Sequence, residues 1–411
     1  MRTVLLGVST RALAESAVRS RPGIVAVDFF GDRDQERVAE SYALGRDLRL
    51  PRTAGALGAA ARRLKAEAVV YGANLENHPE VVASLACDMA VLGNDAAVLR
   101  AVRDWRSLRR FCREAGIPHP TTLFRREEEV ARRGGLWLRK RVCSGGGHGV
   151  RPWAGENLDE HHLLQARVEG RPASVAFVAD GTDSRVIGFS EQLIGSRWLG
   201  ARGFAWCGNV LPFATEPADD GRLTAQVARM ATRLTRHYGL RGVNGADVVV
   251  GRGPDGCACA FLVEVNPRYS ASMELAEQAL GGDVFSLHLE GLAGRLPEVS
   301  PAGRPAAGYY GKAVVYSRRA VTVPDTDAWY ERGRRDVPHQ DDRVARGHPL
   351  CTVLARGADR AACLERLARR AAAVYAETEG GRGERRERSP HLDHRSHAQA
   401  GDRPAQGQVV T

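Results

Sequence analysis

Short apolar runs alternate with helix-spaced segments over the first 93 residues. Runs at 3–8, 24–29, 68–71 and 90–92 predict four strands, and residues 11–19 repeat their apolar positions at helical spacing. Strands that alternate with helices are typical of a parallel sheet with helices on both faces. The sequence therefore predicts an α/β domain at 1–93.

The turn after the first predicted strand shows whether such a domain could bind a dinucleotide. Asp28 ends the second strand, where a dinucleotide-binding fold keeps the acid that holds the ribose. However, the first turn reads Gly7-Val8-Ser9-Thr10-Arg11 and lacks the GxGxxG pattern. We therefore reject an NAD site there.

The pattern changes after a long predicted helix at 95–116, which Gly116-Ile117-Pro118 ends. Beyond it, short apolar strands are separated by tight glycine turns, as in an antiparallel sheet. The elements predicted in this part are strands at 136–142, 162–168, 173–179 and 185–189, a helix at 223–238, and a hairpin of strands 247–250 and 259–265. We assign them to a second domain at 94–295.

The C-terminal part divides into a small unit and a tail. A Pro/Gly linker at 297–305 precedes predicted strands at 312–316 and 350–354 and a helix at 359–376, which form a β-rich unit at 296–376. From 377 to 411 apolar residues almost vanish and the charges balance. Such a segment cannot offset its ordering entropy, so we expect it to be disordered.

Composition and charge narrow the function. The chain has 411 residues, 43% hydrophobic and 26% charged, and no apolar run approaches the ~20 residues of a membrane helix. The formal charge is +10, but 56 of the 59 cations are arginine, which indicates compositional bias rather than a nucleic-acid surface. Eight scattered cysteines without a secretory signal are typical of reduced thiols in a cytoplasmic protein.

One of the three lysines, Lys140, stands just before a glycine-rich segment, Ser144-Gly145-Gly146-Gly147-His148-Gly149. Backbone N–H groups of such a loop can close over phosphates, and glycine lets the backbone approach without a Cβ in the way. A compact ammonium can reach between phosphate oxygens. A plain hairpin with a loose turn is the structural alternative.

A second constellation lies on the predicted hairpin, where Glu264 and Asn266 share a face and Asp247 can lie opposite them. Two carboxylates and an amide oxygen are hard ligands that suit Mg²⁺ bridging phosphates. Arg268 follows, where a guanidinium can hold a phosphate or carboxylate. The alternative is a half-buried strand with exposed polar positions, but an unpaired buried carboxylate at Glu264 would be costly.

Taken in order, these segments resemble the ATP-grasp superfamily. The resemblance spans 1–295 and includes the helix ending in Gly-Ile-Pro, the lysine strand with its glycine flap, a strand ending in Val168-Glu169-Gly170, and Glu264-Val265-Asn266-Pro267-Arg268. The segments 71–79 and 347–353 are similar to predicted carboligases related to biotin carboxylase.

The resemblance implies a Rossmann-like pre-ATP-grasp domain followed by an α+β ATP-grasp core that binds ATP with Mg²⁺ or Mn²⁺. It implies phosphate contacts from Lys140 and the flap 144–149, adenine recognition by the main chain of a hinge at 165–168 that includes Gln165, Arg167 and Val168, and metal ligation by Asp247, Glu264 and Asn266. Lys140 and Arg268 are the implied catalytic residues. The implied reaction activates a small-molecule carboxylate as an acyl phosphate for attack by an amine.

Two positions depart from the pattern of this superfamily. Many members carry a nucleotide-contacting lysine where this chain has Trp105, so Arg103 or Arg106 must substitute or the contact is absent. The stretch 171–174 lacks the ribose-binding acid of some members. A bicarbonate-using carboligase and an inactive nucleotide-binding regulator are the alternative functions; the expected partners are small molecules, with no nucleic acid or membrane, and a homodimer is possible.

Overall fold

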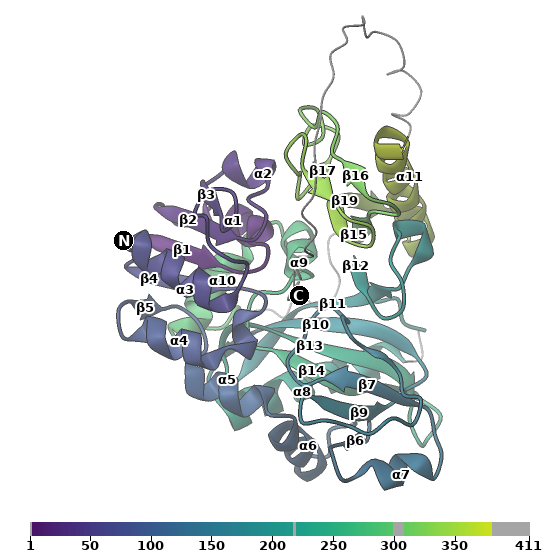
Figure 1. Cartoon of the computed structure of the whole chain (residues 1–411). Helices are drawn as coiled ribbons and strands as arrows, with labels where there is room; N and C mark the ends of the chain where they lie inside the picture. The colour runs from purple at the N-terminus through teal and green to yellow at the C-terminus, as the bar shows by residue number, and fades with distance from the viewer. Residues whose placement is uncertain (1, 217–218, 299–307, 380–411) are drawn as a thin grey trace, which may run out of the picture.

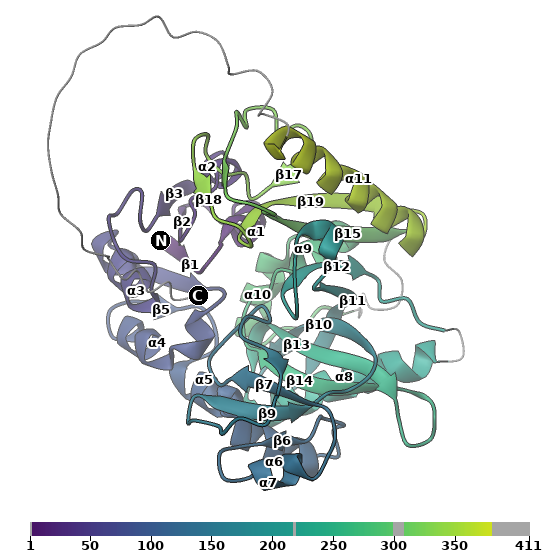
Figure 2. The same cartoon turned by 45° about the vertical axis from the view of Figure 1, so that its right-hand side comes forward.

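The computed structural model describes residues 2–216, 219–298 and 308–379. It places the N-terminal parallel sheet beside a long antiparallel sheet, with a smaller antiparallel sheet lying over one end of the latter (Figures 1 and 2). The predicted linker 297–305 and tail 377–411 fall largely outside the described residues.

The N-terminal sheet is parallel, as predicted. Its order is β3-β2-β1-β4-β5, with β1 at Thr3–Leu6, β2 at Ile24–Asp28, β3 at Glu40–Ala43, β4 at Ala68–Tyr71 and β5 at Ala90–Val91. The sequence analysis missed β3, which lies at an edge and is half polar, so it shows no continuous apolar run. The helices that complete this domain are α1 (Arg11–Ala17), α2 (Arg33–Glu36), α3 (Ala54–Arg63) and α4 (Pro79–Ala86).

Asp28 has a structural role in this domain. Its carboxylate is fully buried and accepts hydrogen bonds from Thr10 N at 2.9 Å and Gly31 N at 2.7 Å. A carboxylate that already accepts these backbone bonds is committed to holding two turns together. This agrees with the rejection of a dinucleotide site at the first turn.

The helix predicted at 95–116 is wrong as a single element. The structure has α5 at Ala96–Arg103 and α6 at Trp105–Glu114, and Asp104 between them has an extended ψ of 108°. The Asp104 side chain caps α6 by accepting a hydrogen bond from Arg106 N at 2.8 Å. Aspartate favours the N-cap position, so Asp104 marks the start of a new helix. The apolar spacing continues across this boundary, which is why the sequence pattern predicted one helix.

The small antiparallel sheet has the order β6-β9-β7-β8. Its strands are β6 (Thr122–Leu123), β7 (Trp137–Arg141), β8 (Arg151–Pro152) and β9 (His162–Ala166), and α7 (Glu128–Arg132) lies in the connection between β6 and β7. The glycine-rich segment joins β7 to β8. Its position between paired strands is the one that the sequence predicts for a flap.

The long antiparallel sheet has eight strands in the order β14-β13-β10-β11-β12-β15-β19-β17. The strands are β10 (Arg171–Asp180), β11 (Ser184–Ile194), β12 (Trp206–Leu211), β13 (Arg241–Arg252), β14 (Ala258–Asn266), β15 (Tyr309–Tyr316), β17 (Arg334–Arg335) and β19 (Pro349–Gly357). The helix α8 (Asp220–Tyr238) packs on one face through Leu223, Val227 and Leu234. On the other side, α9 (Met273–Leu280) and α10 (Val284–Leu292) join the sheet to α1.

The strands of the C-terminal unit extend this sheet instead of forming one of their own. Strand β15 pairs with β12, and α11 (Arg360–Glu379) covers β15 and β19. A separate pair, β16 (Val321–Thr322) with β18 (Arg343–Val344), lies beside them. The sequence could not show this continuity because β12 and β15 are far apart along the chain.

The last helix extends three residues beyond its predicted end at Ala376. Glu377, expected in the tail, accepts hydrogen bonds from Trp329 Nε1 at 3.0 Å and Arg334 Nη1 at 2.7 Å. These bonds tie the end of α11 to the segment around β17. The expected disorder of 380–411 concerns residues outside the described part of the chain.

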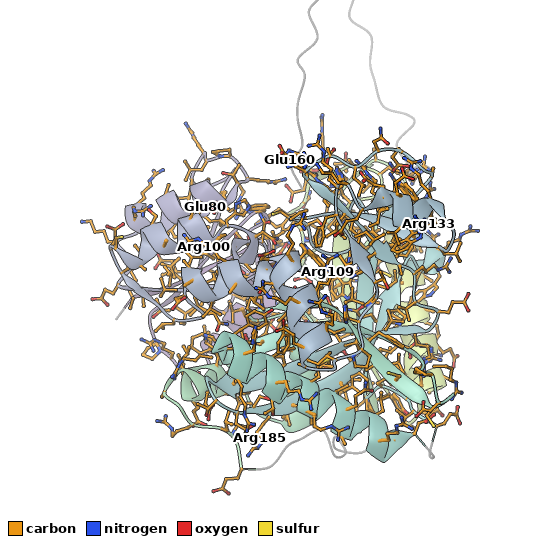
Figure 3. All side chains as sticks on the ribbon, turned by 90° about the horizontal axis from the view of Figure 1, so that it is seen from below. Glu80, Arg100, Arg109, Arg133, Glu160 and Arg185 are labelled. Atoms are coloured by element: carbon orange, nitrogen blue, oxygen red, sulfur yellow. The ribbon has the colours of Figure 1, made fainter. Side chains whose placement is uncertain are left out.

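Charged side chains of both signs are spread over the surface that Figure 3 shows. The labelled residues Glu80, Glu160, Arg100, Arg133 and Arg185 include both signs of charge. Within the described residues, no helix combines the length and the apolar character needed to cross a membrane.

Candidate active site

The predicted site residues converge on one large cavity of about 1260 Å³. The cavity runs between the two antiparallel sheets and onward to the N-terminal domain and the C-terminal strands. Its lining includes these predicted residues: Lys140, Ser144, Gly145, Gly146, Gly147, Gln165, Arg167, Val168, Asp247, Glu264, Asn266 and Arg268. Among the described residues, His148 and Gly149 fall outside this lining.

Lys140 points into the cavity from β7. Its side chain is buried, and its Nζ donates to Gln165 Oε1 at 3.1 Å and lies 4.9 Å from the centre of the Trp105 ring. Burial lowers the pKa of Lys140, and the charges of Glu264 and Asp247 oppose that shift. Lys140 on the small sheet therefore lies close enough to the acidic hairpin of the long sheet to feel the charges of both carboxylates.

The neighbours of Lys140 point elsewhere, as alternation along a strand requires. Arg139 Nη2 lies 3.0 Å from His162 Nδ1 and its Nε lies 3.5 Å from Glu156, while Arg141 is exposed. Lys140 is therefore distinguished from the surrounding arginines by its direction as well as by its chemistry.

The glycine flap rests against the segment that leads into β12. Trp206 N donates to the Gly146 carbonyl at 2.9 Å, and a Cβ on Gly147 would lie 1.8 Å from the Phe204 carbonyl oxygen. Gly147 also has a positive φ of 75°, which side chains disfavour. Both the close approach and the backbone conformation explain why glycine occupies this position.

The acidic hairpin brings Asp247, Glu264 and Asn266 together at the junction of β13 and β14. Asp247 pairs with Glu264 across the strands, next to a β-bulge, and its Oδ2 accepts a hydrogen bond from Asn266 Nδ2 at 3.0 Å. Burial and the nearby charge of Glu264 raise the pKa of Asp247 to about 7. Lys140 faces these two carboxylates without an ion pair to either in the described structure, and a divalent ion with hard-oxygen preference fits them.

Arg268 lies at the same end of the cavity but is already paired. Its Nη2 donates to Glu76 Oε1 at 2.7 Å; the Glu76 side chain is buried, and the Arg268 side chain is 11% exposed. The charge of Glu76 raises the pKa of Arg268 against the effect of burial. Its Nε has no hydrogen-bond partner in the described structure, so part of the guanidinium is still available to an anion.

Trp105 and Arg103 lie where the sequence departs from the expected pattern. Trp105 Nε1 donates to the Val142 carbonyl at 3.0 Å, so the indole fastens α6 to β7 beneath Lys140. Arg103 donates to the Val265 carbonyl at 3.0 Å and to the flap at the Ser144 carbonyl at 3.4 Å. Arg106 instead stacks on Phe124 at 4.1 Å, and neither arginine belongs to the described cavity lining.

The cavity also contains residues that the sequence analysis missed. Gln192 Nε2 donates to Asp247 Oδ1 at 2.8 Å, and Asn209 and Lys312 line the same face of the long sheet. The rarity of lysine, which singled out Lys140, would have singled out Lys312 as well. Gln192 and Asn209 lie on strands whose position beside β13 and β15 only the sheet order reveals.

Comparison with known proteins identifies the domain that holds this site. Residues 102–272 match the family model described as an ATP-grasp domain. Over these residues the chain is similar to ATP-grasp domains. No curated protein matches the sequence.

Solved structures extend the similarity beyond the ATP-grasp domain. The biotin carboxylase of Campylobacter jejuni, in a β-γ-ATP complex, is 15% identical with a TM-score of 0.66 over 88% of this chain and 89% of its own. The biotin carboxylase domain of the Hydrogenobacter thermophilus 2-oxoglutarate carboxylase, in complex with MgADP, ADP and bicarbonate, is 15% identical with a TM-score of 0.63 over 88% of each chain. The L-amino acid ligase of Bacillus licheniformis is 12% identical with a TM-score of 0.64 over 91% of this chain and 97% of its own. At these identities the likeness establishes the fold, and the predicted ATP-grasp architecture is confirmed.

Proposed function

We propose that the protein is an ATP-dependent ligase that joins the carboxylate of a small metabolite to an amine. The observation that carries the proposal is the convergence of Lys140, the glycine flap and the acidic hairpin on one cavity. These elements come from two separate sheets. A shared cavity lined by a cation, backbone N–H groups and paired carboxylates suits a nucleotide triphosphate with its divalent ion.

Each part of the site has a definite task in this proposal. The hinge at Gln165 to Val168 binds the adenine through main-chain groups, and Glu169, which lines the cavity next to it, is a candidate partner for the ribose. The flap covers the phosphates and excludes water. Lys140 stabilises negative charge on the transferred phosphoryl group.

Asp247, Glu264 and Asn266 would hold Mg²⁺ or Mn²⁺. When bound, the ion neutralises charge on the phosphate oxygens. Asn266 orients Asp247 through its amide N–H, and Gln192 does the same from the other side. Arg268 holds the carboxylate that receives the phosphoryl group, and Glu76 fixes the direction of its guanidinium.

The reaction in this proposal has two steps. A carboxylate oxygen attacks the γ-phosphorus of ATP and releases ADP, giving an acyl phosphate. The amine then attacks the acyl carbon, loses a proton and releases phosphate. A cytoplasmic location belongs to the same proposal, and the eight free cysteines support it.

Product formation tests the proposal. Purified protein is incubated with Mg·ATP and a panel of carboxylates and amines, and ADP, phosphate and the amide product are measured together. We expect ADP release that needs both a carboxylate and an amine. ADP release that needs bicarbonate alone would replace the ligase with a carboligase, and ATP binding without turnover on any substrate would indicate a regulator.

A further inference from the structure

The cavity continues well beyond the acidic hairpin. A row of polar side chains follows neighbouring strands through the register pairs Asp247–Ser174, Ser174–Ser190, Gln192–Asn209 and Asn209–Lys312. Four strand spacings separate its ends, which is roughly 19 Å. The row leads from the proposed metal site to a second group of charges, where the N-terminal domain meets the C-terminal strands.

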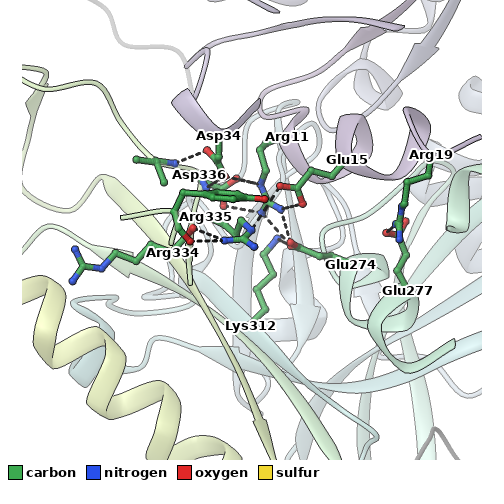
Figure 4. A network of polar contacts seen from close by, with 12 residues as sticks. Arg11, Glu15, Arg19, Asp34, Glu274, Glu277, Lys312, Arg334, Arg335 and Asp336 are labelled. Carbon is green, nitrogen blue, oxygen red and sulfur yellow. Dashed lines mark hydrogen bonds and ion pairs between the residues drawn. The ribbon is translucent and has the colours of Figure 1, made fainter. Parts of the chain in front are cut away.

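Arg11 is the centre of that second group, which we call the Arg11 cluster (Figure 4). The Arg11 side chain is fully buried and donates to Glu274, to Asp336 Oδ1 at 3.0 Å and to Glu15 at 3.1 Å. Lys312 Nζ donates to the other Glu274 oxygen at 2.5 Å. Asp34 lies 3.6 Å from Arg11 and accepts the backbone N–H groups of Asp336 and Val337.

The charges of the cluster do not balance in the described structure. Its cations are Arg11, Lys312 and Arg335, the last of which lies 3.7 Å from Glu15. The carboxylates around them are Glu15, Asp32, Asp34, Glu274 and Asp336. Buried carboxylates in excess of cations are costly unless something compensates them, so the cluster lacks positive charge.

Asp32 is the carboxylate of the cluster that has no ion pair in the described structure. It is the N-cap of α2, yet its side chain makes no capping hydrogen bond, although aspartate normally bonds the helix N–H groups at this position. Its residue is 6% exposed and its Oδ2 has no hydrogen-bond partner within the described structure. Asp32 also lines the cavity, as do Asp336 and Lys312.

The surroundings of Asp32 explain its electrostatic state. Burial raises the pKa of Asp32, and the nearby charges of Asp336, Asp28 and Asp34 raise it further, while Arg11 opposes them. Asp28 already accepts four hydrogen bonds from the turns around it. A cation that reached Asp32 from the cavity would therefore relieve the repulsion that Arg11 only partly offsets.

We propose that Asp32 and Asp336 form a subsite for the protonated amine of a substrate. The inference rests on the proposed ligase function, because it names the charged group by which one of the joined substrates is recognised. An ammonium would donate a charge-assisted hydrogen bond to Asp32 Oδ2 and restore the charge balance of the wall. Lys312 stays bound to Glu274, and Arg11 stays bound to Glu15 and Asp336.

A binding experiment with a simple probe tests this subsite. n-Butylammonium is titrated into wild type, Asp32→Asn and Asp88→Asn, and n-butanol serves as the uncharged probe. Asp88 is a matched control because it is exposed in the same domain, where it pairs with Arg62. Thermal shift and calorimetry are the readouts, and neither depends on turnover.

We expect butylammonium, but not butanol, to stabilise wild type and Asp88→Asn. Asp32→Asn should bind the ammonium at least about tenfold more weakly, the factor expected for losing a charged hydrogen-bond partner. Without ligand, Asp32→Asn should melt at a higher temperature than wild type, because the substitution removes a repelled buried charge. A purely structural Asp32 predicts the opposite shift.

The result that overturns the subsite is equal butylammonium binding by wild type and Asp32→Asn, or no binding by wild type. Mg·ATP is titrated into the same samples. If Mg·ATP binds and butylammonium does not, the subsite is wrong and the ligase proposal survives. If butylammonium binds as expected and Mg·ATP does not, the ligase proposal fails instead.

Discussion

The acidic hairpin and the Arg11 cluster are two groups of buried charges on one cavity, and they are built in opposite ways. The hairpin takes Asp247, Glu264 and Asn266 from two adjacent strands, and its carboxylates face each other without a cation between them. The Arg11 cluster takes its members from segments up to 325 residues apart, and most of its carboxylates are paired with a cation of the chain.

Apart from the proposed amine subsite at Asp32 and Asp336, the difference separates charges that await a ligand from charges that hold domains together. Burial and the charge of Glu264 raise the pKa of Asp247 to about 7, whereas Arg11 and Lys312 lower the pKa of Glu274 to about 2 despite burial. Removing a charge from the hairpin should therefore damage function and spare the fold. Removing Arg11 should damage the fold first.

Arg11→Met should give the largest effect on stability. Loss of the guanidinium leaves several carboxylates buried without their partner, which typically costs about 3–5 kcal/mol of unfolding free energy. Urea unfolding followed by circular dichroism measures the change. The control is Arg62→Met, which breaks an exposed ion pair with Asp88 and should cost less than about 1 kcal/mol. Equal effects of the two variants would mean that the cluster does not join the domains.

Glu264→Gln should lower ATP turnover by about a hundredfold or more, because it removes a ligand of the ion that stabilises the phosphoryl transfer. The melting temperature should not fall, since the substitution also removes the charge that repels Asp247. Asn266→Ala, which removes another proposed ligand of the ion, should reduce turnover to a similar extent. Either variant with near wild-type phosphate release would refute the metal assignment, and a loss of folding would favour a structural strand.

Lys140→Ala should weaken ATP binding and reduce turnover by about tenfold or more, and Lys140→Arg should restore only part of the loss. Arg139→Ala and Arg141→Ala are the matched controls on the same strand, because their side chains lie outside the cavity lining in the described structure. Steady-state kinetics of the four variants provide the comparison. Similar small effects throughout would leave the flap without its phosphate-binding lysine.

Truncation of the C-terminus should have the smallest effect on stability. The size of that effect should depend on whether the chain ends before or after Glu377. A chain that ends after Glu379 should keep its melting temperature and its ATP binding. A chain that ends after Ala376 also loses Glu377, which binds Trp329 and Arg334, and should melt a few degrees lower. Identical melting curves for the two chains would show that the end of α11 contributes nothing to stability.

The sequence predicted those features whose signals are local. The parallel strands, the flap after Lys140 and the pairing of Asp247 with Glu264 each follow from apolar spacing or from residues within one hairpin. The helix break at Asp104 also has a local signal, because aspartate is a good N-cap residue. The apolar spacing continues across it, so the pattern predicted a single helix.

The rest depended on contacts between distant segments. The pairing of Arg268 with Glu76 joins residues 192 positions apart, and the junction of β12 with β15 joins two strands that are separated along the chain by α8, β13, β14, α9 and α10. Such pairings depend on packing and on the closure of long loops, and no spacing rule within the sequence records them. The Arg11 cluster is the extreme case, which explains why none of its members was predicted.

Binding of Mg·ATP tests the central claim most directly. Calorimetric titration of wild type with a non-hydrolysable ATP analogue is carried out with Mg²⁺ and again with EDTA, and Glu264→Gln is titrated in parallel. The account predicts that wild type binds the analogue with Mg²⁺ but much more weakly with EDTA, and that Glu264→Gln binds it weakly even with Mg²⁺. In the last two cases the cation between the nucleotide and the hairpin is missing or poorly held. Absence of binding to wild type at millimolar Mg·ATP analogue, or equal binding with and without Mg²⁺, would contradict it.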